Sequence, residues 1–482
     1  MDTNEFRAAG HRIVDRLADL LAGIEKRPLF PKDATPSRVD ALFDEPVPEE
    51  PAPLEALFAE LEEKLLPNCT HVNHPGYFGL ITPSPLPAGI LADFIASALN
   101  QNVGAWSIGP SATAMEKRVV RWLCDLAGYD ARAGGLLASG GMMANFVGMK
   151  LGRDFASGDR AQKRGADGKL AAYASDERHV SVDKAADAVG LGRLGLRVIP
   201  SGDDFRVRID ALEAAIANDK AAGVRPAVLV AMAGSTNTGA VDDLRALRAI
   251  ADRERMWLHA DAAYGGGMLL SRKTPGVLGG LALADSITID PHKWFFAPLD
   301  AGALLVRDAS RLLASFGLRP PYLSNPGEPP PDPKDERFDY FVHGFEQSRR
   351  FRGLKVWMGL KRYGTKTIGD WVDANVDHAL RLHELATAHP RFESASRPRM
   401  SAVCVRYTAP GLDGATLDRL HATVTRRIEA QGKFWFSTTV LKERAHFRVC
   451  PVNFRTRREH IDELFATLVR ECDAAAEELA RR

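Results

Sequence analysis

The chain has 482 residues, of which 45% are hydrophobic and 26% are charged, and its formal net charge is +1. A chain of this length exceeds one compact core, so we expect two or three packed units. The near balance of 63 basic and 62 acidic residues gives no electrostatic reason to expect binding to nucleic acid or to an anionic membrane.

The five cysteines are scattered and show no paired metal-ligand spacing. This favours a reducing compartment over a disulfide framework, and we predict no metal site. The first ten residues, MDTNEFRAAG, lack the basic start and apolar core of a signal peptide. No stretch reaches the roughly 18 apolar residues of a membrane span. We therefore expect a soluble, cytoplasmic protein.

Residues 1–84 are predicted to form an N-terminal helical arm. Apolar residues recur at helical spacing over 3–26, and a second helix is expected over 54–66. The connection from Pro28 to Pro53 holds seven prolines and cannot be one regular element. Two helices and an extended segment make no core alone, so the arm packs either on a partner subunit or on its own chain.

Residues 67–111 mix aromatic residues with glycine and proline, which suits either the walls of a pocket or a structural turn. A helix is expected over 112–128. A short apolar run then leads through Ser139, Gly140 and Gly141 directly into another helix. A glycine turn at a helix N-terminus presents free N–H groups to a phosphate, although Gly-Gly before a helix is often only a turn.

Predicted strands and helices alternate from residue 171 to residue 308. Strands are expected at 171–175, 196–200, 227–233, 256–261, 285–290 and 302–308, and helices at 180–189, 209–219 and 243–252. The strands are almost continuously apolar, as expected where both faces of a strand are covered. The pattern predicts an α/β domain with a mainly parallel sheet between helices. Catalytic residues then belong at the ends of strands.

Two neighbouring strand ends carry an acid and a lysine. Asp261 ends the apolar run WLHAD, and Lys293 lies in TIDPHKWFFA, just after the next predicted strand. An amine and a carboxylate held in this way are what an enzyme needs to hold pyridoxal phosphate. The lysine forms a Schiff base with the cofactor, and the acid keeps the pyridine nitrogen protonated.

The segment 317–350 is long, irregular and rich in proline, which predicts either a lid over a site or a surface insert. Helices are expected over 353–363 and 367–389. Shorter strands and helices at 415–430 and 458–480 then indicate a separate α+β unit. The expected division is the arm at 1–84, a large cofactor-binding domain at 85–375 and a small C-terminal domain at 376–482.

The chain resembles the pyridoxal-phosphate-dependent group II amino-acid decarboxylases, and among them the aromatic-L-amino-acid decarboxylases. The resemblance runs in order over most of the chain, through the motifs SDERHVSVDKAA, HADAAYGG, DPHKW and SRRFRGLKVW. It implies fold type I, with a mainly parallel seven-stranded sheet in the large domain and bound pyridoxal 5'-phosphate. It also implies a homodimer with active sites at the subunit interface, in which the arm packs on the partner.

The resemblance implies roles for single residues as well. Lys293 matches the Schiff-base lysine, Asp261 the acid at the pyridine nitrogen and His179 the histidine stacked on the cofactor ring. Tyr322 matches a loop tyrosine that returns a proton to the substrate carbon, where aldehyde synthases carry phenylalanine. The remaining cofactor positions are Ala263 and Thr236 near the ring, and Ser139, Gly140, Gly141, His292 and Asp290 near the phosphate.

Asp290 departs from the pattern, since the animal aromatic decarboxylases carry Asn there. A carboxylate near a phosphate is unfavourable unless it is turned away or hydrogen-bonded. Relatives also often carry Ser or Thr where this chain has Gly140, Gly141 and Met142, which leaves more of the phosphate binding to backbone N–H groups.

The implied substrate positions are Leu80, Ile81, Thr82, Trp106, Ser348 and Arg349. The wall at 80–83 is aliphatic where aromatic decarboxylases carry Tyr and Phe, and Trp106 offers an aromatic alternative. Ser348 stands where relatives vary between Gly and Ser, a change associated with the ring type accepted.

We therefore expect decarboxylation of an L-amino acid, with an aromatic one favoured. Histidine or another neutral amino acid remains an alternative, as does aldehyde-synthase or transaminase chemistry on the same scaffold. Glutamate is disfavoured because no basic anchor is evident in the pocket. The intact set of Lys293, Asp261, His179 and Tyr322 argues against a non-catalytic relative that serves as a binding module.

Overall fold

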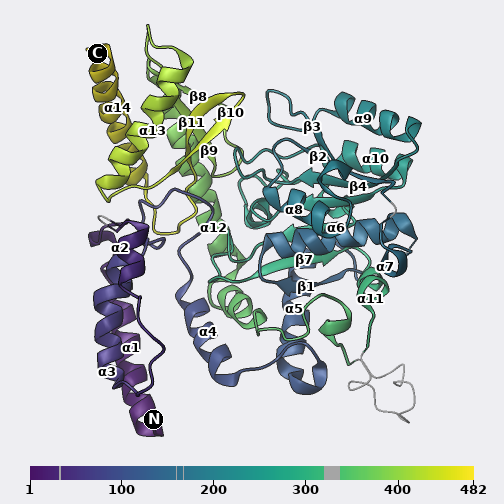
Figure 1. The fold of residues 1–482 in the computed structure, drawn as a ribbon, viewed down its shortest axis with the longest axis horizontal. Coiled ribbons are helices and arrows are strands. Elements are labelled where there is room, and N and C mark those ends of the chain that lie inside the picture. Colours follow the sequence, from purple (N-terminus) through teal and green to yellow (C-terminus); the bar gives the residue numbers. More distant parts are fainter. Residues whose placement is uncertain (32–33, 159, 167, 320–336, 482) are drawn as a thin grey trace. The chain divides into compact units, whose positions relative to one another are not determined.

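The computed structural model describes residues 1–31, 34–158, 160–166, 168–319 and 337–481. These form two compact units. One contains residues 85–376 and 398–402, and the other contains residues 1–84, 377–397 and 403–482. The predicted α/β class is confirmed, because the first unit holds a sheet of seven strands and the second a sheet of four (Figure 1).

The seven-stranded sheet has the order β1-β7-β6-β5-β4-β2-β3. Its strands are β1 (Gly134–Ala138), β2 (Leu170–Ser175), β3 (Leu196–Ile199), β4 (Arg225–Met232), β5 (Trp257–Asp261), β6 (Ser286–Ile289) and β7 (Gly302–Val306). Strands β2 to β6 are parallel, and β7 runs antiparallel to both of its neighbours. Strands β2, β5, β6 and β7 are buried along their whole length, which explains their continuous apolar runs. The predicted mainly parallel sheet is confirmed.

Helices cover this sheet, and α6 crosses strands β4 to β7 at close range (Figure 1). The close approach depends on glycine, because a Cβ on Gly148 would lie 2.4 Å from the His259 ring and a Cβ on Gly152 2.6 Å from Val228. The helices of this unit are α4 (Pro87–Leu99), α5 (Pro110–Leu126), α6 (Gly141–Ser157), α7 (Ala161–Arg164), α8 (Val180–Ala188), α9 (Ile209–Ala221), α10 (Leu244–Glu254) and α11 (Ser310–Phe316). Short 3₁₀ turns occur at Trp106–Ile108, Arg193–Gly195, Gly265–Leu270, Leu281–Leu283 and Tyr340–Val342.

The long helix α12 (Gly353–Ala388) contains the boundary between the two units. Two helices, 353–363 and 367–389, were expected here, and the structure joins them across Gly364. Gly364 has a φ of +72°, in the left-handed region that favours glycine, so the chain bends where the helical pattern breaks.

The second unit contains a small antiparallel sheet with the order β10-β11-β9-β8. Its strands are β8 (Phe392–Ser394), β9 (Val403–Tyr407), β10 (Ser437–Leu441) and β11 (Arg444–Val449), and its C-terminal helices are α13 (Gly414–Ala430) and α14 (Arg458–Ala480). Apolar residues of these elements form one buried cluster with Phe78. Strands were expected at 401–408 (SAVCVRYT) and 447–453 (FRVCPVN), which overlap β9 and the end of β11, whereas β8 and β10 were not expected.

The N-terminal residues belong to this second unit by their contacts. Their elements are α1 (Thr3–Ala22), a 3₁₀ turn (Ile24–Lys26), α2 (Pro36–Ala41), α3 (Leu54–Glu60), a π-helical turn (Leu61–Leu65) and a 3₁₀ turn (Leu66–Asn68). Arg16 of α1 and Glu62 of the π-helical turn form an ion pair of 3.1 Å. Across the part of the chain that is described, we find no helix with the length and hydropathy needed to cross a membrane.

Candidate active site

The ends of β5 and β6 bring the acid and the lysine to one edge of the large sheet. Asp261 is the last residue of β5, and Lys293 lies in the turn that follows β6. The two strands are parallel neighbours, with Asp261 in register with Thr288. Because parallel strands end at the same edge of a sheet, the carboxylate and the amine belong to one region of the surface.

Lys293 is paired with Asp290. Its Nζ lies 3.0 Å from Asp290 Oδ2, and its side chain is 21% exposed. His292 Nε2 lies 3.6 Å from the same oxygen. The other carboxylate oxygen, Asp290 Oδ1, is buried and has no hydrogen-bond partner among the described residues. The Asp290 carboxylate is therefore turned toward Lys293, and the positive charge of the lysine offsets the negative charge of the carboxylate.

The glycine turn predicted as a phosphate cradle joins the end of β1 to the start of α6. No side chain of the described residues caps α6, so the N–H groups of its first turn remain available for an anion. A Cβ on Gly140 would lie 3.1 Å from His292 Cε1, and a Cβ on Gly141 would lie 2.7 Å from Asp290 Oδ2 and 3.0 Å from Ala263 Cβ. The turn thus lies directly against the residues around Lys293.

His292 is held with one nitrogen free. Its Nδ1 accepts a hydrogen bond of 3.0 Å from the N–H of Ala301, so Nε2 is the nitrogen left to face the Gly140 turn. Burial lowers the pKa of His292, which favours the neutral ring. A neutral histidine with its proton on Nε2 is a suitable donor to a phosphate oxygen.

His179 begins α8 as its N-cap residue. Its Nδ1 lies 2.9 Å from Ser181 Oγ and accepts a hydrogen bond of 3.2 Å from the Ser181 N–H. Burial lowers the pKa of His179, while Asp261 raises it and Lys293 lowers it by their charges. His179 therefore lies within electrostatic reach of both the acid and the lysine.

Asp261 has two neighbours that the sequence analysis did not predict as site residues. Asn145 Nδ2 donates a hydrogen bond of 2.8 Å to Asp261 Oδ2, and a second one of 2.8 Å to Ser181 Oγ. The N–H of Ala263 donates to Asp261 Oδ1 at 3.1 Å. A single asparagine on a glycine-rich helix is a weak signal in a sequence, because its importance depends on strands more than a hundred residues away.

Several predicted residues lie elsewhere or are not described. Thr236 is half-buried in the loop that follows β4, the next strand along the same sheet edge. Leu80, Ile81 and Thr82 belong to the second unit, with Leu80 exposed and Ile81 buried, and their contact with substrate stays a prediction. Tyr322 and the other residues of the predicted lid from 320 to 336 lie outside the described residues. Ser348 is exposed at the surface.

Arg349 is buried in an ion pair behind β1. Its guanidinium donates to Glu116 Oε1 at 2.5 Å, to the Leu137 carbonyl at 2.6 Å and to the Val103 carbonyl at 3.1 Å. Glu116 Oε1 also accepts from the Leu137 N–H at 3.1 Å. With 3% of its side chain exposed, Arg349 supports the strand that leads to Ser139, and the predicted contact with substrate has no geometric support in the single chain.

The Glu116–Arg349 pair makes a stability prediction. In Glu116→Gln, the buried guanidinium loses its counter-charge, and we expect the free energy of unfolding to fall by about 3–5 kcal/mol. Urea unfolding of the purified protein measures this change. Asp130→Asn serves as a control, because it removes an exposed pair with Arg132 and should leave the unfolding curve in place. Equal changes in the free energy of unfolding for the two substitutions would contradict the stabilising role of the buried pair.

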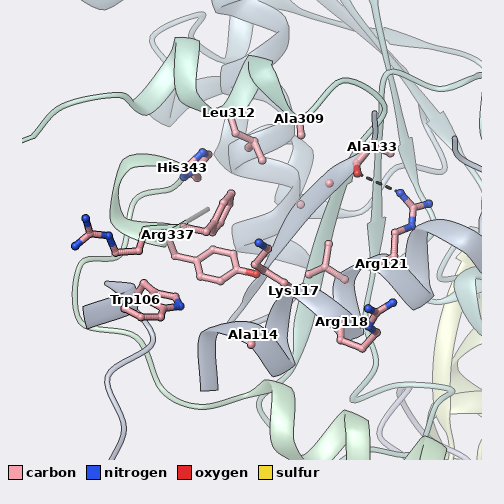
Figure 2. Close-up of a pocket in the computed structure, with 15 residues that line it drawn as sticks. Trp106, Ala114, Lys117, Arg118, Arg121, Ala133, Ala309, Leu312, Arg337 and His343 are labelled. Atoms are coloured by element: carbon pink, nitrogen blue, oxygen red, sulfur yellow. Dashed lines mark hydrogen bonds between the residues drawn. The ribbon is translucent and has the colours of Figure 1, made fainter. Parts of the chain in front are cut away.

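A cavity of about 1060 Å³ lies at the opposite end of β1 (Figure 2). Gly134, the first residue of the strand, lines it, whereas Ser139 follows the last residue, roughly 17 Å further along. Figure 2 shows Trp106 in this cavity together with the basic side chains Lys117, Arg118, Arg121 and Arg337. The cavity is therefore distinct from the Lys293 cluster, and the role of Trp106 as a wall of the substrate pocket stays a prediction.

Comparison with known proteins identifies the family. The model of the "Pyridoxal-dependent decarboxylase conserved domain" matches residues 36–408. The chain belongs to this family. The decarboxylase is 30% identical to the aromatic-L-amino-acid decarboxylase of Bacillus atrophaeus, over 100% of this chain and 97% of that protein. The earlier resemblance is thereby confirmed, and the chain is a carboxy-lyase.

Two further relatives bear on the chemistry. The crystal structure of Oryza sativa tryptophan decarboxylase with pyridoxal phosphate and tryptamine superposes with a TM-score of 0.91 at 28% identity, covering 98% of this chain and 99% of that one. This confirms fold type I. A phenylacetaldehyde synthase of Petunia hybrida is 31% identical over 92% of this chain and 89% of its own.

The decarboxylase depends on pyridoxal phosphate, and the residues present fit that cofactor. Lys293 Nζ supplies an amine for the aldehyde, and Asp261 supplies a carboxylate for the pyridine nitrogen. The uncapped start of α6 and His292 supply donors for the phosphate. Gly141 leaves room where a Cβ would collide with Asp290.

Proposed function

We propose that the decarboxylase converts an aromatic L-amino acid into the corresponding amine and carbon dioxide. The observation that carries this proposal is the cluster of Lys293, Asp261 and His179, in a chain that matches an aromatic-L-amino-acid decarboxylase over its whole length. The matched rice structure contains tryptamine, which supports an aromatic substrate.

Bound pyridoxal phosphate would supply an aldehyde for the amino group of the substrate and a ring that takes up the electron pair left when carbon dioxide departs. Lys293 would hold the cofactor covalently through Nζ. Asp290 Oδ2, 3.0 Å from Nζ, is placed to accept the proton that the ammonium must lose before its nitrogen can react. Asp261 keeps the pyridine nitrogen protonated, which strengthens the ring as an electron acceptor.

His179 lies on the face of the cofactor ring in this proposal and orients the substrate carboxylate. Holding the bond to that carboxylate perpendicular to the ring selects decarboxylation over transamination. Tyr322, by the family resemblance, returns a proton to the substrate carbon after carbon dioxide has left.

A panel of about twenty amino acids, each incubated with the cofactor-loaded protein, tests the proposal through the carbon dioxide released. We expect the highest kcat/KM with tyrosine, phenylalanine, tryptophan or dihydroxyphenylalanine, and one amine formed for each carbon dioxide. Highest turnover with glutamate or an aliphatic amino acid would overturn the aromatic assignment. Highest turnover with histidine would select the alternative that the sequence left open.

Aldehyde-synthase chemistry is the second candidate, because the Petunia relative carries that name. Tyr322 favours simple decarboxylation over this alternative. In Tyr322→Phe we expect most of the amine to be replaced by aldehyde, ammonia and hydrogen peroxide, because the proton donor for the substrate carbon is lost and dissolved molecular oxygen then takes up two electrons. Tyr363→Phe, in α12, is the matched control and should still form amine. An unchanged amine yield in Tyr322→Phe would remove the proton-donor role.

We further propose a cytoplasmic homodimer in which the N-terminal arm packs on the partner. Large apolar side chains of the arm are exposed in the single chain, namely Phe6, Ile13, Val14, Leu17, Leu57, Leu61 and Leu65. Such a set on two adjacent helices indicates a covered surface. None of the five cysteines, all of which lie among the described residues, forms a disulfide, as suits a reducing compartment.

A further inference from the structure

A chain of buried hydrogen bonds connects Asp261 to His179, and Asn145 is its junction. Asn145 Nδ2 lies 2.8 Å from Asp261 Oδ2 and 2.8 Å from Ser181 Oγ, while its Oδ1 lies 3.0 Å from His259 Nε2. Asn145 is 1% exposed, and Ser181 and His259 are fully buried. Water therefore does not compete for these bonds, and each donor must meet an acceptor.

The direction of each bond on the β5 side follows from the Asp261 carboxylate, which only accepts. The Asn145 amide must turn its NH₂ group toward Asp261, which leaves Oδ1 facing His259. His259 Nε2 must then carry a proton and donate it. Burial lowers the pKa of His259 to about 4, so the ring is neutral at ordinary pH and its Nδ1 is an acceptor.

Ser286 and Trp257 have hydrogen bonds that agree with this tautomer of His259. Ser286 Oγ lies 2.8 Å from His259 Nδ1 and accepts a hydrogen bond of 2.8 Å from Trp257 Nε1. Since the indole only donates, the Ser286 hydroxyl proton is free to go to His259. The tautomer of His259 is therefore fixed from both of its nitrogens.

On the α8 side of Asn145, the hydrogen bonds determine the tautomer of His179. Ser181 Oγ accepts from Asn145, so its own proton is available for His179 Nδ1 at 2.9 Å. The Ser181 N–H also donates to that nitrogen at 3.2 Å. With two donors on Nδ1 and a pKa lowered by burial, the neutral His179 ring carries its proton on Nε2.

We propose that Asn145 is a positioning residue which, with His259 and Ser181, holds Asp261 as a fixed acceptor for the pyridine nitrogen and His179 in the tautomer that donates from Nε2. This proposal rests on the proposed function for the role of His179 toward substrate. It makes His179 a hydrogen-bond donor on the cofactor face and disfavours it as a general base. The glycine at 148 belongs to the same arrangement, because it lets α6 lie close enough for Asn145 to reach β5.

Asn145→Asp gives the sharpest test, since it changes charge and protonation but not shape. While it is protonated, the introduced carboxyl group can donate to Asp261 and accept from His259 as the asparagine does. Two adjacent carboxylates raise the pKa of one of them, so this proton is kept at low pH and lost as pH rises. The ionised side chain then repels Asp261. The charged groups that act on His179 are Asp261, Lys293, Asp290 and Lys184, and Asp261 also acts on His259.

The measurement is the dissociation constant of pyridoxal phosphate from mildly acidic to mildly alkaline pH. We expect the ratio of the variant's constant to that of the wild type to be near one at the acidic end. The ratio should rise roughly tenfold to a hundredfold at the alkaline end, the effect of losing a hydrogen bond to a charged group. A ratio that does not change with pH would contradict the proposal.

Ser181 provides a second test that does not depend on the fold of the first variant. In Ser181→Ala we expect kcat to fall about tenfold, with a folded protein that still binds the cofactor. Ser181→Thr keeps the hydroxyl and should restore kcat. Ser157→Ala, a buried serine at the far end of α6, is the matched control. A threonine variant no better than alanine would contradict the role of the hydroxyl.

The two proposals fail differently. A wild-type protein that binds pyridoxal phosphate but releases no carbon dioxide from aromatic amino acids would contradict the proposed function. The pH dependence of cofactor binding in Asn145→Asp would still decide the role of Asn145.

Discussion

Replacing Lys293 with alanine is expected to reduce carbon dioxide release by at least about a thousandfold and to leave the cofactor bound only non-covalently. The reason is geometric and chemical. Lys293 Nζ is the amine held in the turn after β6, paired at 3.0 Å with Asp290. Turnover of the aromatic substrate and visible absorbance of the lysine-bound cofactor measure the two effects.

A matched control for this prediction is Lys361→Ala. Lys361 lies in α12 over the Trp357 ring, outside the cluster, and its loss should leave turnover and absorbance unchanged. Full turnover of Lys293→Ala with wild-type absorbance would contradict the assignment of the lysine.

Replacing Asp261 with asparagine is expected to lower kcat by roughly a hundredfold or more and to weaken cofactor binding. Asparagine has the same shape but no charge, so a buried pyridinium would lose its counter-ion, a loss of the size seen when one partner of a buried pair is removed. The Asn145 and Ala263 donors, at 2.8 Å and 3.1 Å, would also face an amide instead of a carboxylate. Steady-state kinetics and cofactor titration measure the change.

Asp252→Asn is the control for the acid. Asp252 pairs with Arg248 on α10 and is 70% exposed, so its loss should change neither kcat nor cofactor affinity. If Asp261→Asn retained wild-type kcat, protonation of the ring by this acid would not be part of catalysis.

The large sheet was predictable because its strands are buried on both faces. Runs such as those of β4 and β7 are apolar at nearly every position, and helices separate most of the strands. The two strands that were missed are different. β8 has three residues, and β10 alternates between exposed and half-buried positions, so neither gives a continuous apolar run.

The residues of the candidate site also divide into those that the sequence predicts and those that it does not. Lys293 and Asp261 were predictable because strand ends place them together and short motifs mark them. Asn145, Ser181 and His259 were not, because the hydrogen bonds that join them through Asn145 span 36 or more positions in sequence. The hydrogen bonds of these residues form only when α6, α8 and β5 come together in the folded protein.

Arg349 has a structural role that its motif did not reveal. Its position in SRRF suggested a place near the substrate, but the sequence held no sign that Glu116 would lie beneath it. Burial of an arginine is tolerable only with a partner, and Glu116 and the carbonyls of Val103 and Leu137 satisfy the guanidinium. A residue can therefore be necessary to the site while supporting it from behind.

The most direct test of the central claim is to locate the cofactor on the chain. Borohydride reduction of the loaded protein makes the bond between pyridoxal phosphate and its lysine permanent, and peptide mass spectrometry then finds the modified residue. We expect a single pyridoxyl group on the peptide that contains DPHKW, at Lys293. A modification spread over surface lysines, or placed on another single lysine, would contradict the account.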